Sequence, residues 1–220
     1  MKLLVKKILK LFGIYFNKVE GRLLELEKEF KEFKKFKYFS NGKKVLFTHS
    51  FGIYEPSFIH DKLMAFALSL RGFKIFATFC DGIQDTECNV YGGVWGGKEQ
   101  FNKNCQNCQN KSQKLWSFLN PNNIFKYSHY LNQEDYVKTD ATLEKILNDK
   151  WSNHQEDGWD IGFWAKDILV NNYVVSDYKL IENYEKLGRA HLRNLLLCKL
   201  ACEKIIEDTN PDRIISNDSY

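Results

Sequence analysis

The chain has 220 residues and is 44% hydrophobic and 15% aromatic, which is enough apolar material for a buried core and excludes disorder throughout. Its 32 basic and 28 acidic residues leave a formal net charge of +4, too small to indicate a nucleic-acid partner, and we predict none. No stretch reaches the roughly 18 uninterrupted apolar residues of a membrane-spanning helix, and no signal-peptide cleavage site follows the start. The sequence therefore predicts a cytoplasmic protein.

Residues 1–39 are predicted to form an amphipathic helical leader. Apolar side chains recur at steps of three and four residues from Phe16 to Phe33, and mostly Lys and Glu lie between them. Residues 1–16 are both basic and apolar, as in helices that lie on anionic membrane surfaces, so contact with the inner face of the membrane is one interpretation. The other interpretation is that the helix packs on the domain or pairs with a partner helix.

Residues 40–220 are predicted to form one α/β domain. Apolar runs at 44–50 and 74–80 indicate strands, and the apolar-periodic helix between them closes at Gly72, so the three form a parallel strand–helix–strand unit. A third parallel strand is predicted within 211–220. Further helices are predicted at 112–120, 133–151 and 177–210, and the apolar stretch 158–174 is compatible with either helix or strand.

Three loops follow the predicted strands, at 48–56, 80–88 and 216–220. Ligands of parallel α/β sheets bind just outside the carboxyl ends of the strands, so these loops are the candidate binding site. His49 lies where a general base is useful, because the pKa of histidine is near neutrality. The alternative is that His49 bonds locally and caps the next helix. The other candidate ligand contacts are Ser50, Gly52, Glu55, Asp81, Asn217 and Asp218.

Four cysteines lie in or beside a predicted insertion at 81–112, with the spacing C-x7-C-x16-C-x2-C: Cys80, Cys88, Cys105 and Cys108. A Cys-x-x-Cys pair can share one tetrahedral zinc ion, although the first pair is spaced more widely than in zinc ribbons. A structural zinc, four reduced cysteines and a disulfide all remain open, and a reducing cytoplasm disfavours the disulfide. His129 could replace Cys88 as a ligand. Cys198 and Cys202 share the apolar face of the long helix and are predicted core residues.

Several motifs together resemble a known family. The strand KVLFTHS, the helix and strand ending LSLRGFKIFATFCDG, the CQNC pair, and the later GFWAKDILVNNYVVSD and PDRIISNDSY resemble the amino-terminal domain of bacterial surface- and capsular-polysaccharide biosynthesis glycosyltransferases. The resemblance covers about residues 43–220 and leaves out the leader.

The resemblance implies a Rossmann-like parallel sheet flanked by helices, which is the amino-terminal, acceptor-side half of a GT-B-like architecture. It implies sugar transfer from a nucleotide-sugar to a hydroxyl of a glycan or lipid-linked glycan. For such a reaction we expect His49 to be the general base and the three loops to line the cleft. The carboxyl-terminal nucleotide-sugar domain is expected to be absent from this chain, so a donor would bind only with a second domain present. The alternative is a non-catalytic protein, either a truncated copy or a zinc-stabilised interaction module.

Overall fold

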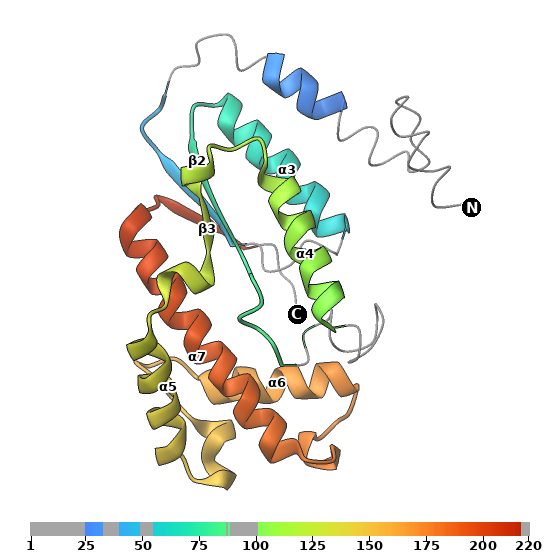
Figure 1. Ribbon diagram of the computed structural model, residues 1–220, viewed down its shortest axis with the longest axis vertical. Coiled ribbons are helices and arrows are strands. Elements are labelled where there is room, and N and C mark those ends of the chain that lie inside the picture. Colours follow the sequence, from blue (N-terminus) through green and yellow to red (C-terminus); the bar gives the residue numbers. More distant parts are fainter. Residues whose placement is uncertain (1–24, 33–39, 49–54, 87, 89–100, 217–220) are drawn as a thin grey trace, which may run out of the picture.

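A parallel four-stranded sheet lies at the centre of the computed structural model, which describes residues 25–32, 40–48, 55–86, 88 and 101–216 (Figure 1). The order of the strands across the sheet is β3-β2-β1-β4, and all neighbouring pairs are parallel. The strands are β1 Lys44–Thr48, β2 Lys74–Phe79, β3 Ile124–Lys126 and β4 Arg213–Ile215. The predicted α/β fold with a Rossmann-like parallel sheet is confirmed.

The two central strands are buried on both faces, which explains their unbroken apolar sequences. Val45 and Phe47 of β1 point into one core, whereas Leu46 points into another on the opposite face. β2 repeats this alternation in register, since Val45 pairs with Ile75 and Leu46 pairs with Phe76. Helices must therefore cover both faces of the sheet.

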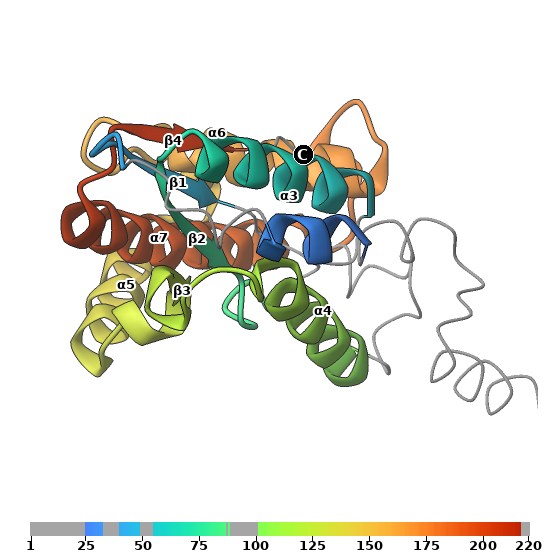
Figure 2. The same ribbon diagram turned by 90° about the horizontal axis from the view of Figure 1, so that it is seen from above.

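One face of the sheet is covered by α3 (Glu55–Leu70) and α4 (Phe101–Trp116), and the other by α7 (Tyr184–Thr209) (Figure 2). The carboxyl-terminal half of α7 packs on the sheet through Ala201 and Ile205. Its amino-terminal half packs against α5 (Gln133–Lys145) and α6 (Ile161–Tyr173), which surround the buried Trp151. Short 3-10 helices connect these elements: η2 Pro121–Asn123, η3 Tyr127–Tyr130, η4 Asn148–Asn153 and η5 Tyr178–Leu180.

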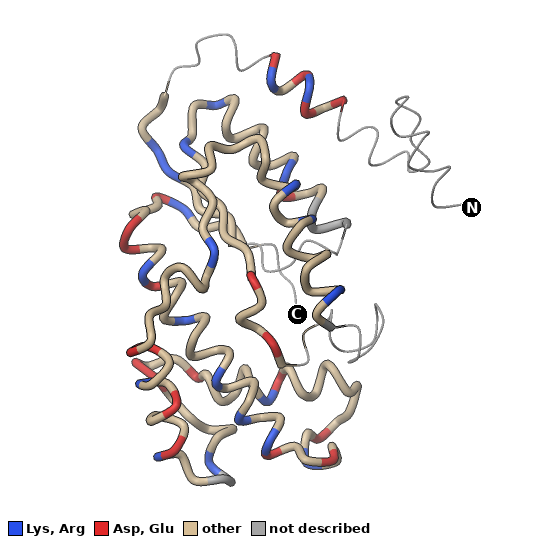
Figure 3. Tube along the Cα trace, in the orientation of Figure 1, with Lys and Arg blue, Asp and Glu red and all other residues tan. Residues whose placement is uncertain are grey.

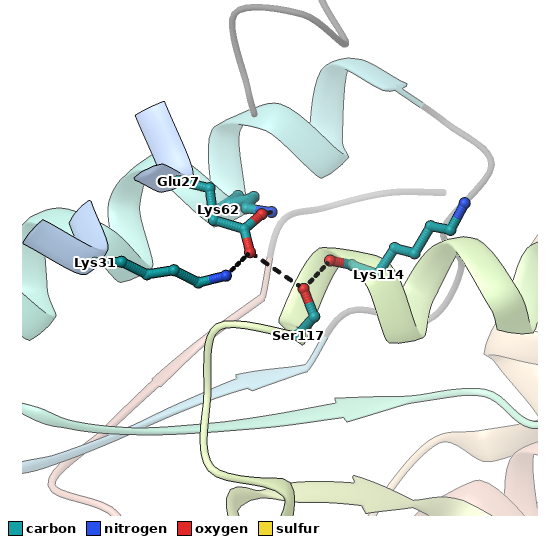
Figure 4. Close-up of polar contacts among 5 residues, drawn as sticks. All are labelled: Glu27, Lys31, Lys62, Lys114 and Ser117. Carbon is teal, nitrogen blue, oxygen red and sulfur yellow. Dashed lines mark hydrogen bonds and ion pairs between the residues drawn. The ribbon is translucent and has the colours of Figure 1, made fainter. Parts of the chain in front are cut away.

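Residues 25–32 form a helix that packs on α3 and on the end of α4. Phe30 stacks on Phe66 at 4.3 Å between ring centroids and meets the edge of Phe118 at 5.3 Å. Beside these rings, the Glu27 carboxylate pairs with the buried Lys62 at 3.0 Å. Lys31 and Ser117 also approach Glu27, as Figure 4 shows. This part of the predicted leader is therefore part of the folded domain.

Residues 1–16, predicted to contact a membrane, lie outside the described residues. In the part of the chain that the structure describes, no helix is long and apolar enough to cross a membrane.

Several elements differ from the sequence-based expectations. The helix expected at 133–151 ends at Lys145, and the helix expected at 177–210 starts at Tyr184. The helix expected at 112–120 is α4, which starts eleven residues earlier and ends at Trp116, and the strand β3 was not expected at all. The buried face of α4 consists largely of small polar side chains, Asn104, Cys108 and Ser112, followed by Leu115, so the sequence shows little apolar periodicity. The last part of the predicted insertion at 81–112 therefore belongs to α4, the helix that connects β2 to β3. The ambiguous stretch 158–174 contains helix α6.

Candidate functional site

The carboxyl edge of the sheet contains a topological switch point between β1 and β4. From β1 the chain continues to β2 and β3 on one side, and it returns to β4 on the other side. The two strands end side by side, and the Thr48 hydroxyl donates to the carbonyl oxygen of Ile215 at 3.5 Å. Crevices of this kind are the usual ligand sites of parallel α/β sheets.

Most of the residues predicted to contact a ligand at this switch point come just after β1 and β4 in the sequence, beyond the residues that the structure describes there. Glu55 opens α3, and its side chain is not described. His49, Ser50, Gly52, Asn217 and Asp218 lie outside the described residues, and their roles stay predictions.

Asp81, just beyond β2, joins the ends of two neighbouring strands. One carboxylate oxygen accepts a hydrogen bond from the backbone N–H of Ser128 at 3.2 Å, and the other accepts from the Ser128 hydroxyl. Ser128 lies in η3, directly after β3. A ligand at Asp81 would therefore have to share these oxygens with Ser128.

The segment that follows Asp81 is held by α4 on one side and by α7 on the other. Gly82 adopts a left-handed φ of +100°, and a Cβ there would lie 3.7 Å from the Sγ of Cys105 in α4. The Gln84 side chain donates to the Sγ of Cys198 in α7 at 3.4 Å. Figure 1 shows this segment descending from β2 along α7 towards α6.

The amide of the buried Asn194, also in α7, completes this attachment. When the amide is oriented so that both of its hydrogen bonds form, its nitrogen donates to the Asp85 carboxylate at 3.3 Å and its oxygen accepts from Thr86 N–H at 3.1 Å. The segment is thus fixed to α7 by polar contacts on three successive residues, 84–86.

Thiols from three elements gather around this segment. Burial raises the pKa of Cys80 to about 11, and the nearby thiols of Cys88 and Cys105 contribute to the rise. Burial also raises the pKa of Cys198 far above its usual value, with further contributions from Cys80 and Cys202. The thiols of Cys80 and Cys198 are therefore protonated at neutral pH, and protonated thiols are poor nucleophiles. The six cysteines, all of them among the described residues, form no disulfide bond with one another.

The four cysteines of the expected grouping lie just beyond β2, in the segment that follows it and on α4. Cys105 faces Gly82 at the strand end, while Cys108 is buried along α4 with only 6% of its surface exposed. Cys198 and Cys202 pack against the core beside β1 and β2, as predicted. Cys198 is nevertheless also a neighbour of Cys80, which nothing in its local sequence indicates, and His129 is exposed on η3. Among the described residues, no three His, Cys, Asp or Glu side chains form a group that could hold a metal ion.

Comparison with known proteins identifies no relative of this chain. No protein-family model, no curated protein and no solved structure matches the chain.

Proposed function

We propose that the chain is the acceptor-side domain of a glycosyltransferase-like protein that acts in surface or capsular polysaccharide synthesis. The observation that supports this proposal most is the strand order. With β4 beside β1 and β2 on the other side of β1, the loops after all three strands start from one edge of the sheet. These are the loops expected from the sequence to line the acceptor cleft.

In the proposed reaction, a glycan hydroxyl attacks the anomeric carbon of a nucleotide-sugar. The new glycosidic C–O bond forms while the bond from the anomeric carbon to the phosphate oxygen breaks, and the nucleotide leaves with that electron pair. His49 accepts the hydroxyl proton. A second domain would hold the nucleotide-sugar, and this chain would bind and orient the acceptor.

His49→Ala tests the proposal, with transfer of labelled sugar to a glycan measured in the presence of the donor-binding domain. Loss of a general base typically lowers the rate by about 100- to 10,000-fold. His129→Ala is the matched control, because His129 is an exposed histidine on the same edge, but beyond β3 rather than at the switch point. Turnover within a few-fold of the unaltered protein in His49→Ala would refute the assignment.

A zinc-stabilised interaction module is the second proposal. It is supported by the proximity of Cys88 and Cys105 to Cys80, whose pKa they help to raise, although these side chains do not form a metal-binding group as they stand. Zinc would require these thiols to lose their protons and to close around the ion, with Cys108 as the fourth ligand. Elemental analysis of the purified protein should then find about one zinc per chain, lost in Cys105→Ser and retained in Cys202→Ser. Metal content near zero in the unaltered protein would remove this proposal.

A further inference from the structure

A pocket outside the sheet edge lies where η4 meets the start of α6. Its volume is about 300 Å³, within the size range of small-ligand pockets. The lining residues are Ser152, Asn153, His154, Gln155, Asp160 and Phe163. This lining offers amide, imidazole, hydroxyl and carboxylate groups, and it contains neither Lys nor Arg. Such a pocket suits an uncharged ligand with many hydroxyl groups better than a phosphate.

Three large aromatic side chains of the segment that contributes Asp160 and Phe163 to the pocket are exposed, and one of them, Phe163, lines it. Trp159, Phe163 and Trp164 expose 54%, 51% and 40% of their surfaces. The rings of Trp159 and Trp164 lie 5.8 Å apart, and the Lys166 ammonium lies 4.5 Å from the centre of the Phe163 ring. Exposed apolar patches bordered by polar groups commonly mark binding sites. Phe163 lines the pocket, and Trp159 and Trp164 are the chain neighbours of the lining residues Asp160 and Phe163.

The backbone around the pocket is fixed by two features. Asp157 and Gly158 have φ values of +52° and +81°, as in a type I′ turn, and reciprocal backbone hydrogen bonds join Glu156 to Trp159. The Asp157 carboxylate is bound by Lys199 of α7 at 2.7 Å. The turn that presents Trp159 is therefore attached to α7.

The second feature is the close approach of α6 to η4. The N–H of Gly162 donates to the carbonyl oxygen of His154 at 2.9 Å, and a Cβ on Gly162 would overlap the carbonyl oxygen of Trp151. The two walls of the pocket are thus held against each other by backbone contacts. A site that is formed before its ligand arrives avoids part of the entropic cost of binding.

From these features we infer that this surface binds carbohydrate, specifically an uncharged pyranose within a glycan. The C–H face of the sugar ring stacks on the exposed aromatic rings, because these rings offer large apolar faces at low conformational cost. The hydroxyl groups of the sugar bond to Asn153, Gln155 and Asp160. Gln155 already donates to Asp160 at 2.6 Å, which orients both side chains.

This inference goes beyond the proposed transfer reaction, because binding here requires neither His49 nor a sugar donor. Figure 1 shows α6 on the side of the sheet to which the carboxyl end of β2 and its following segment point. A glycan bound beside α6 would lie on the same side of the molecule as the proposed acceptor edge. The surface would then hold a more distant part of the acceptor chain.

The test is titration of the chain with neutral disaccharides, namely N-acetylchitobiose, maltose and cellobiose, followed by ligand-observed NMR and tryptophan fluorescence. We expect saturable binding of at least one of them. Trp159→Ala and Asn153→Ala should each weaken that binding by about tenfold, the equivalent of one ring contact or hydrogen bond. Leu180→Ala, which removes another exposed apolar side chain, should leave the affinity unchanged.

Circular dichroism of each variant shows whether it folds, and Trp164→Ala replaces Trp159→Ala if that variant does not. No saturable binding of any of the three sugars, or equal binding in Trp159→Ala and Leu180→Ala, would overturn the inference. Binding to anionic phospholipid vesicles that depends on Trp159 would overturn it in favour of a membrane surface. Because His49→Ala leaves this surface intact, sugar binding in that variant separates this inference from the transferase proposal.

Discussion

Replacement of Lys62 by Met tests whether residues 25–32 are an integral part of the domain. Only 4% of Lys62 and 9% of Glu27 are exposed, and the substitution leaves the Glu27 carboxylate buried without its closest cation. Breaking a buried ion pair typically costs about 3–5 kcal/mol. Lys31 remains 3.1 Å from Glu27 but is 62% exposed, so it compensates only in part. We therefore expect a loss of about 2–4 kcal/mol in the free energy of unfolding.

The assay is urea unfolding followed by circular dichroism and by tryptophan fluorescence, to which the buried Trp116 contributes. Lys31→Met is the matched control, because this exposed pair within one helix should contribute no more than about 0.5 kcal/mol. The double substitution Glu27→Leu with Lys62→Met should recover most of the loss, because an apolar pair removes both buried charges. A loss below about 1 kcal/mol in Lys62→Met, or no recovery in the double variant, would contradict the reasoning.

The same pair predicts a dependence of stability on pH. Burial alone would raise the pKa of Glu27, but Lys62 and Lys31 outweigh this effect and lower it below the ordinary 4.5. The unfolded chain therefore takes up the proton first, so the stabilisation is complete at neutral pH and is lost as the pH falls below about 4.5 towards the lowered pKa. Glu27→Gln should flatten this part of the stability profile.

Three further outcomes are expected. Gly188→Ala should lower the free energy of unfolding in urea by about 1–3 kcal/mol, because a Cβ would overlap the ring of Trp151, which is 1% exposed. An unchanged midpoint of urea unfolding would refute this close packing. Iodoacetamide should modify Cys80 slowly at neutral pH and faster towards pH 11, and rapid modification at pH 7 would contradict the raised pKa. The free energy of unfolding should also fall between about pH 9 and 11, because the Cys80 thiol ionises first in the unfolded chain. Ser128→Ala should speed hydrogen exchange at the ends of β2 and β3, since Asp81 loses the hydroxyl that joins them; unaltered exchange would show that this bond does not couple the strands.

Much of the fold could be predicted from the local sequence. β1 and β2 are buried on both faces, and such strands require continuous apolar runs, so both were recognisable. The helix between them was recognisable from its apolar spacing and from the glycine that follows it. Both kinds of element could be recognised because their patterns involve only residues close together in the sequence and the burial of each one.

The element β3 could not be predicted in this way, because its three residues are only half-buried at the edge of the sheet. α4 was recognised only at its end, since Asn104, Cys108 and Ser112 occupy buried positions where apolar side chains are expected. The identity of both elements depends on the strand and core that they pack against.

The candidate sites divide along the same line. That Cys80 and Asp81 follow a central strand is a property of the local sequence, and the structure places both there. Two other features join residues that are far apart in the chain: the approach of Cys198 to Cys80 and the bonds of Asp81 to Ser128. A third, the exposed aromatic surface at the start of α6, depends on which face of that helix is covered. Sequence periodicity reports which side of an element is buried, whereas only the packing of α7 across the sheet and against α6 decides which side chains meet.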